Sequence, residues 1–245
     1  MEWAIFADVH GNLDALEAVL ADARAAGAGR YACLGDIVGY GAEPDACCER
    51  VRALGCVAVV RGNHDHACSH RVPLEWFNPL AAAAVRWTRQ RLSAENRDWL
   101  RGLPYEAEID GRAQLVHGAL HDPRHWPYLF EAADAGPHFP HQTLPLCFVG
   151  HTHVPIVLAQ IGGNVFESRL KAFRGAAEEG AKVVVNAGSV GQPRDGNPKA
   201  CYLLFDPAEG LVVPRRVEYD PTPTAAKILA AGLPKQLALR LFLGR

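Results

Sequence analysis

The sequence lacks the excess of positive charge with which proteins usually attract nucleic acid or anionic membranes. Its 245 residues carry 25 Lys or Arg side chains against 27 Asp or Glu, and the formal net charge at pH 7 is -2. A nearly neutral chain exerts no general attraction on polyanions. We therefore expect neither nucleic acid nor a membrane as the partner, unless a basic patch is local.

Long apolar runs are missing as well. The apolar stretch at residues 3–7 is followed by Asp8 and His10, far short of a signal-peptide core or a membrane-spanning helix. The seven cysteines form no Cys-x-x-Cys pair, so neither a zinc ribbon nor a disulfide framework is indicated. We expect a protein of the reducing cytoplasm without a targeting segment.

Internal repeats, low-complexity tracts and linkers are also absent from the sequence. A hydrophobic content of 49% supplies ample material for a core. Since α/β layers of this length often form one unit, we expect a single domain over residues 1–245.

The first part of the chain alternates strand and helix patterns. Leu13, Leu16 and Leu20 recur at helical spacing, and Gly27 ends that run. Such alternation predicts parallel strands with helices packed on the sheet. The expected strands are residues 3–7, 31–34 and 57–60, and the expected helices are residues 12–26 and 44–54.

The pattern changes after Asp65. Asp110-Gly111 between two apolar stretches is a strong hairpin signal, so antiparallel strands are expected in the second half. Helices are expected at 79–92 and 93–103, where Trp76, Trp87 and Trp99 pack, and again from residue 222. Strands are expected at 105–109, 112–117, 146–149, 155–161, 165–168, 182–186, 200–205 and 211–219, the last three completing a second sheet with Pro214 at its edge.

These elements predict an α/β (α+β) fold class with the architecture of a four-layer sandwich. Two facing mixed β-sheets with helices on their outer faces would bury the apolar residues of both strand sets. Residues 118–145, rich in His, Pro and aromatic side chains, interrupt the pattern. An irregular segment of that length is more typical of a lid or substrate loop than of a linker.

Five polar motifs each follow an expected strand. At a strand exit a side chain leaves the sheet and can face a crevice that it shares with neighbouring exits. Carboxylate, amide and imidazole ligands without thiolate suit Mn, Fe, Zn or Ni in five- or six-coordinate sites, so a polynuclear metal site is predicted. The motifs are Asp8-Val9-His10, Gly35-Asp36, Gly62-Asn63-His64-Asp65, Val116-His117-Gly118 and Gly150-His151-Thr152-His153.

The order of these motifs resembles the signature of the calcineurin-like metallophosphoesterase superfamily, and the resemblance extends from residue 4 to about residue 200. It implies the two-sheet fold already expected and two divalent or trivalent metal ions. By resemblance, the first ion is bound by Asp8, His10, Asp36 and His153, and the second by Asp36, Asn63, His117 and His151.

The resemblance also implies a mechanism. Two ions about 3.5–4 Å apart hold a bridging hydroxide, bind the phosphoryl oxygens of a substrate and support in-line attack at phosphorus. His64 would face the leaving oxygen, to protonate it or stabilise its charge. Asp65 would form a hydrogen bond with His64 and fix its tautomer.

A second signature runs from Asn186 to Arg194. It resembles a segment of a bacterial and archaeal branch often labelled diadenosine-tetraphosphatase-like, with Ala187 in place of the usual proline. We expect its glycines to let backbone amides approach the metals. Arg194 either clamps phosphate or forms a structural salt bridge, and Tyr40 either packs or stacks on a base or sugar of the substrate.

The function expected from these features is hydrolysis of phosphodiesters or nucleoside polyphosphates, with a small phosphorylated substrate such as a dinucleoside polyphosphate. A protein serine/threonine phosphatase is the first alternative, because Arg61 precedes Gly62 as additional arginines do in such enzymes. A non-catalytic scaffold of the same fold is the second, although no ligand of the signature is missing. A nuclease is disfavoured by the near-neutral charge.

Overall fold

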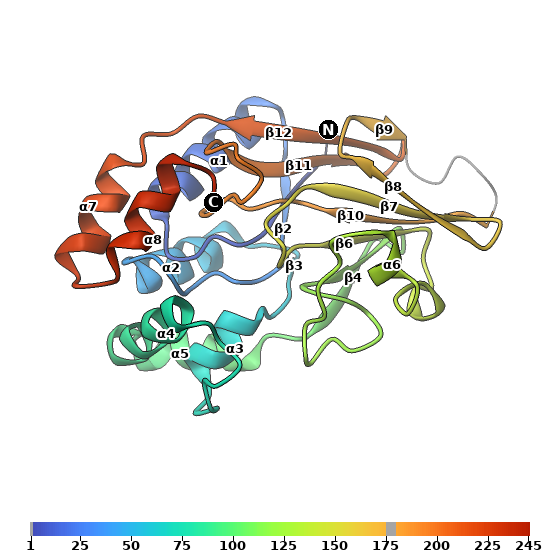
Figure 1. Ribbon diagram of the computed structural model, residues 1–245. Helices are drawn as coiled ribbons and strands as arrows, with labels where there is room; N and C mark the ends of the chain where they lie inside the picture. The colour runs from blue at the N-terminus through green and yellow to red at the C-terminus, as the bar shows by residue number, and fades with distance from the viewer. Residues whose placement is uncertain (1, 175–179) are drawn as a thin grey trace.

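The computed structural model describes residues 2–174 and 180–245 and contains, in that part of the chain, two mixed six-stranded sheets (Figure 1). In the first sheet, β1, β2 and β3 run parallel, and β11, β12 and β9 add antiparallel pairs. The strands of this sheet, in spatial order, are β3 (Ala58–Val59), β2 (Arg30–Cys33), β1 (Trp3–Phe6), β11 (Ala200–Asp206), β12 (Leu211–Val217) and β9 (Phe173–Arg174).

The second sheet has its own group of three parallel strands, β5, β6 and β10, and β4, β7 and β8 extend it with antiparallel pairs. In spatial order its strands are β4 (Glu106–Ile109), β5 (Ala113–Val116), β6 (Leu146–Val149), β10 (Lys182–Asn186), β7 (Ile156–Ile161) and β8 (Asn164–Arg169). The predicted antiparallel strands in the second half of the chain are therefore confirmed, and they occur there together with parallel pairs.

The assignment of the last three expected strands to one sheet is wrong. Only β10 joins the second sheet, whereas β11 pairs with β1 in the centre of the first. Residues 200–205 are buried on both faces, as a central strand requires. The edge position of Pro214 is confirmed, because β9 pairs with β12 only at Leu211 and Val212 and leaves the outer side of Pro214 without a strand.

The two sheets pack face to face, as expected for the sandwich. Trp3 and Ile5 of β1 meet Phe148 of β6 and Val185 of β10 in one buried apolar cluster. The outer face of the first sheet is covered by α1 (Leu13–Ala25) and α2 (Pro44–Leu54), and that of the second by the segment containing α6 (Ala132–Ala135) and the 3₁₀ turn η1 (Phe139–His141). The four-layer fold class is confirmed.

A third group of helices lies at the end of the sandwich where the parallel strands finish (Figure 1). Tyr40, Ala84, Ile228 and Leu237 form an apolar cluster that joins the loop after β2 to α4, α7 and α8. Among the described residues no helix is both long and apolar enough to cross a membrane. The remaining helices are α3 (Asn63–Ser69), α4 (Pro79–Arg91), α5 (Ala94–Gly102), α7 (Thr222–Ala230), α8 (Lys235–Leu239) and the 3₁₀ turn η2 (Arg240–Phe242).

Two local expectations are corrected. The motif at Asn63 was expected to be a turn but begins helix α3, because the Asp65 carboxylate accepts the backbone N–H of Gly62 and so caps the first turn. Trp76 was expected to pack beside Trp87 and Trp99, yet its side chain is 94% exposed. Trp87 and Trp99 do pack against the apolar clusters.

Candidate metal centre

The carboxyl ends of parallel strands in both sheets bring the predicted ligands together. β1, β2 and β3 end at this point in one sheet, and β5, β6 and β10 end at it in the other. Among the described residues, three buried groups result in each of which the ligand atoms lie within 4.8 Å of one another. One of them, formed by His10, Asp36 and His64, shares a residue with each of the other two, which we call the triads. The triads are Asp8, His10 and His153, and Asp36, His117 and His151.

Three of the histidines are oriented by backbone carbonyls. Nδ1 of His10 contacts the carbonyl of Val38 at 3.1 Å, and Nδ1 of His117 contacts that of Leu34 at 2.7 Å. Nδ1 of His153 contacts the carbonyl of Gln192 at 2.6 Å. A carbonyl only accepts, so each Nδ1 carries a proton and each Nε2 faces the centre.

The facing nitrogens of the first triad need a cation between them. Nε2 of His10 lies 3.1 Å from Nε2 of His153. Two lone pairs at that distance repel, whereas two nitrogens bound to one ion at about 2.1 Å are separated by ~3.0–3.4 Å. The geometry therefore fits a shared metal ion.

The carboxylate of Asp36 contacts both triads. Its Oδ2 lies 3.6 Å from Nε2 of His10 and 3.3 Å from Nε2 of His117, while its Oδ1 accepts the backbone N–H of His64. Oδ1 of Asp8 and Oδ1 of Asn63 are buried and accept no hydrogen bond. Buried oxygens without a donor are rare in folded proteins, and a metal ion would satisfy them. The donor set thus fits two ions with Asp36 between them.

The charges of the centre support the same interpretation. Burial opposes ionisation of Asp36, but the imidazoles of His117 and His64 hold the pKa of Asp36 well below its usual range. Burial alone would lower the pKa of His117, yet the carboxylates of Asp36 and Asp8 raise it to about 9. In the protein without metal, a proton on His117 therefore compensates a carboxylate charge that a metal ion would otherwise neutralise.

The backbone is strained where the ligands lie. Residues other than glycine seldom adopt a left-handed conformation, which destabilises the chain by roughly 1–2 kcal/mol at each position. Several such residues around one centre indicate that the geometry is maintained for function. The left-handed residues here are Asp8, His10, Asp36, Tyr40, His151 and His153, with φ between 50° and 70°.

His64 is buried beside this centre, on the first turn of α3. Its Nδ1 has no hydrogen-bond partner and packs against Gly39, where an added Cβ atom would lie 2.4 Å from that nitrogen. Burial lowers the pKa of His64 to about 4. The ring is therefore neutral at pH 7 until an anion approaches it.

The expected hydrogen bond between Asp65 and His64 is not formed. Instead, the Asp65 carboxylate accepts the backbone N–H groups of Asp36 at 2.7 Å, Ile37 at 2.9 Å and Val38 at 3.2 Å, in addition to that of Gly62. Both of its oxygens are used by these donors. Asp65 thus ties the loop of Asp36 to the start of α3 and positions ligands from two motifs.

The segment from Asn186 to Arg194 braces the loop after β1. The amides of Val190 and Gly191 donate to the carbonyls of Ala7 and Asp8, so the expectation that glycine amides face the metals is wrong. Gly191 is required for this contact, because a Cβ atom there would lie 1.8 Å from the carbonyl oxygen of Val9. The role of the motif is to hold Asp8 and His10 in place.

Arg194 and Tyr40 lie next to the triads. The guanidinium of Arg194 donates to Oε1 of Gln192, lies 5.5 Å from the centre of the Tyr40 ring and leaves a buried Nε without an acceptor. No carboxylate in the described part of the chain forms a salt bridge with it. Tyr40 is only 5% exposed and packs against His10 and His64, which favours a packing role over base stacking.

A cavity of about 550 Å³ opens beside the centre, and Asn63, His64 and His151 line it. The irregular segment after β5 contributes Tyr128, whose ring stacks on that of His151 at 4.0 Å, and other residues of the segment lie buried on the second sheet. His66 also lines the cavity. In the sequence, only the length and the aromatic content of residues 118–145 indicated that this segment lines a cavity.

Arg61 does not reach the cavity. Its guanidinium donates to the carbonyls of Arg101 and Leu103 and to the hydroxyl of Tyr105, and so it terminates α5. The protein phosphatase alternative depended on Arg61, and Arg61 therefore has a structural role.

The model of the calcineurin-like phosphoesterase superfamily domain matches residues 1–210. The chain belongs to this superfamily, as its motifs predicted. An uncharacterized protein of Methanocaldococcus jannaschii is 40% identical over 248 residues, which cover 99% of this chain and 98% of the relative.

Two solved structures are similar over nearly their full length. A metallophosphoesterase from Sphaerobacter thermophilus is 42% identical and has a TM-score of 0.87, with 100% of this chain and 99% of the other covered. A hypothetical protein from Pyrococcus horikoshii is 23% identical and has a TM-score of 0.79, with coverage of 99% and 98%. At that lower identity the likeness concerns the fold alone.

Proposed function

We propose that the protein is a dinuclear metal-dependent phosphoesterase that hydrolyses phosphodiester or nucleoside polyphosphate bonds of a small substrate. The observation that carries the proposal is the pair of buried triads with the Asp36 carboxylate between them. Asp8, His10, Asp36 and His153 would hold one ion of Mn, Fe, Zn or Ni, and Asp36, Asn63, His117 and His151 would hold the other.

When bound, such ions lower the pKa of coordinated water and neutralise the charge of a phosphoryl group. The chain's own residues would complete the chemistry. His64 borders both the centre and the cavity, so its ring would hold the proton that the leaving oxygen takes. An incoming phosphate raises the proton affinity of this neutral imidazole.

Arg194 would orient the substrate. Its unpaired Nε and its place beside Tyr40 leave donors for a phosphoryl oxygen that projects from the centre. Asp65 and Gln192 would act only through the residues that they hold, Asp65 through the Asp36 loop and Gln192 through its carbonyl on Nδ1 of His153.

The test is hydrolysis by manganese-loaded protein of three substrates side by side: an aryl phosphomonoester, an aryl phosphodiester and diadenosine tetraphosphate. Product formation is followed by chromatography, with the Asp36→Ala protein as the blank. We expect turnover that requires both metal and Asp36, with the diester or the tetraphosphate preferred. Two bound ions without turnover of any substrate would contradict the proposal and favour a scaffold.

A further inference from the structure

The cavity beside the centre has aromatic walls that metal binding and hydrolysis do not require. They come from two loops that are distant in the sequence, the loop before α4 and the segment after β5. Its volume of about 550 Å³ lies within the range of small-molecule sites, ~300–1,000 Å³. The aromatic residues of the two loops are Trp76, Phe77, Trp126 and Tyr128.

Trp76 lies in the loop before α4 with its indole 94% exposed. An indole offers a large flat apolar surface on which a planar ring can stack. The Trp76 ring makes no aromatic contact among the described residues. A planar ring in the cavity mouth would cover it.

Trp126 faces the same cavity and is held rigidly. Its backbone is left-handed, with a φ of 49°, and its indole Nε1 donates to the carbonyl of Arg61 at 3.2 Å. Gly118 allows this arrangement, because a Cβ atom at that position would lie 2.7 Å from Cα of Trp126. A strained residue fixed by two contacts indicates a wall that is formed before the ligand arrives.

The polar groups of the cavity suit an anion. Burial lowers the pKa of His66 to about 4, so its ring is neutral beside Trp126. Arg124 is exposed and lies over the Tyr105 ring, and no carboxylate occurs among the described residues that line the cavity. A negatively charged ligand with a flat ring therefore meets no carboxylate in the lining.

We infer that this cavity binds the planar ring of the substrate, and that the substrate is a phosphoester of a nucleoside whose base stacks on Trp76. The inference rests on the proposed function, because Asn63, His64 and His151 line the other side of the same cavity and would receive the phosphate. An aromatic side chain can stack on any base. We therefore expect the protein to distinguish substrates that have a base from substrates that lack one.

The test uses two diesters that differ only in the base, adenosine 5′-(methyl phosphate) and ribose 5-(methyl phosphate). Manganese-loaded protein should hydrolyse the adenosine diester with a kcat/KM about tenfold higher, which is the range of stacking on one aromatic side chain. Trp76→Ala should reduce this ratio to below about threefold. Because Trp76 is exposed, the variant should keep its fold.

Phe166→Ala is the matched control. Phe166 is another exposed aromatic residue, on β8 and outside the cavity, and its replacement should leave the ratio unchanged. A wild-type ratio near one, or a ratio that Trp76→Ala does not change, would overturn the inference about the ring site. Hydrolysis of either diester would still support the proposed function.

If no diester is hydrolysed, a binding measurement still tests the ring site separately from the proposed function. Calorimetry with adenosine monophosphate and ribose 5-phosphate measures the preference for a base without turnover. Tighter binding of adenosine monophosphate that is lost in Trp76→Ala supports the ring site even if no diester is hydrolysed. Equal affinities would contradict it.

Discussion

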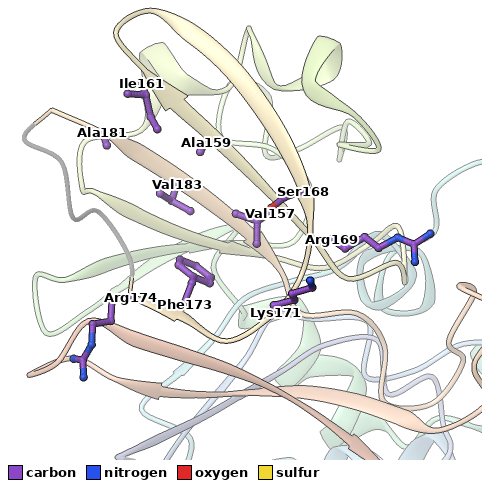
Figure 2. A pocket seen from close by; sticks show the side chains of 10 residues that line it. All are labelled: Val157, Ala159, Ile161, Ser168, Arg169, Lys171, Phe173, Arg174, Ala181 and Val183. Atoms are coloured by element: carbon purple, nitrogen blue, oxygen red, sulfur yellow. The ribbon is translucent and has the colours of Figure 1, made fainter.

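Two cavities of similar size lie near opposite ends of strand β10. They differ in the backbone strain and in the unpaired buried polar atoms around them. One, of about 550 Å³, adjoins the candidate metal centre at the carboxyl end of the strand. The other, of about 620 Å³, lies between β7, β8, β9 and the first residues of β10 (Figure 2). We call the second one the edge cavity.

The edge cavity is built from regular strands. Val157, Val183 and Phe173 form an apolar centre, and Arg169 and Arg174 extend away from it (Figure 2). None of its ten described residues has a left-handed backbone or a buried polar atom without a partner. At the candidate metal centre both features are concentrated, and both are typical of functional sites.

The largest effect should follow from removal of the carboxylate that contacts both triads. Asp36→Ala takes away the oxygen near His10 and His117 and should abolish binding of both ions. Hydrolysis should fall by on the order of 10³-fold or more. Metal content by plasma emission spectroscopy and turnover of an aryl phosphodiester check this, and retention of full turnover would refute the role of Asp36.

A smaller loss of turnover is expected when the His64 side chain is retained but moved from its position. In Gly39→Ala the new Cβ atom would lie 2.4 Å from Nδ1 of His64, so the ring must move, and a shift of about 1 Å lowers turnover by roughly 10²-fold.

Gly27→Ala is the control for this displacement. Gly27 has a similar φ of 83° against 91° at Gly39, but no atom lies within 4 Å of an added Cβ. Both variants should lose about 1–2 kcal/mol of unfolding free energy, and only Gly39→Ala should lose turnover. Equal rates in the two variants would remove His64 from the mechanism.

Replacement of Arg194 should affect substrate binding more than turnover. Arg194→Lys keeps the charge but loses the two-pronged geometry with which a guanidinium binds a phosphoryl group, so KM should rise about tenfold. Steady-state kinetics and a thermal melt are measured together. A lower melting temperature with an unchanged KM would show that Arg194 serves only to hold Gln192.

The smallest effect is expected at the edge cavity. A triple variant removes the basic rim of this cavity by the substitutions Arg169→Ala, Lys171→Ala and Arg174→Ala. Because exposed charges outside the centre are screened by salt, kcat/KM for an aryl phosphodiester should stay within about twofold of the wild-type value. A large loss of hydrolysis would mean that the two cavities are functionally linked.

Much of the metal centre could be predicted because its information is local. Pairs such as Asp8 with His10, and His151 with His153, lie two residues apart directly after buried strands, so parallel pairing gathers the ligands of each sheet and the packing of the two sheets brings both sets together. Asp65 could have been recognised as a capping residue, since it stands three positions after Gly62 at the start of an apolar helix face.

The remaining features depend on contacts between distant segments. The sheet to which β11 belongs is decided by its pairing with β1, nearly 200 residues earlier, and its apolar sequence suits either sheet. The cavity walls at Trp76 and Trp126 come from two separate loops, and nothing local in either loop indicates the other. The bracing of Asp8 by Gly191 is likewise visible only once the chain is folded.

The most direct test of the central claim is anomalous diffraction from crystals of the manganese-loaded protein. We expect two peaks at the carboxyl ends of the parallel strands, one beside Asp8, His10 and His153, the other beside His117 and His151, with the Asp36 carboxylate between them. A single peak, or two peaks away from these side chains, would contradict a dinuclear centre.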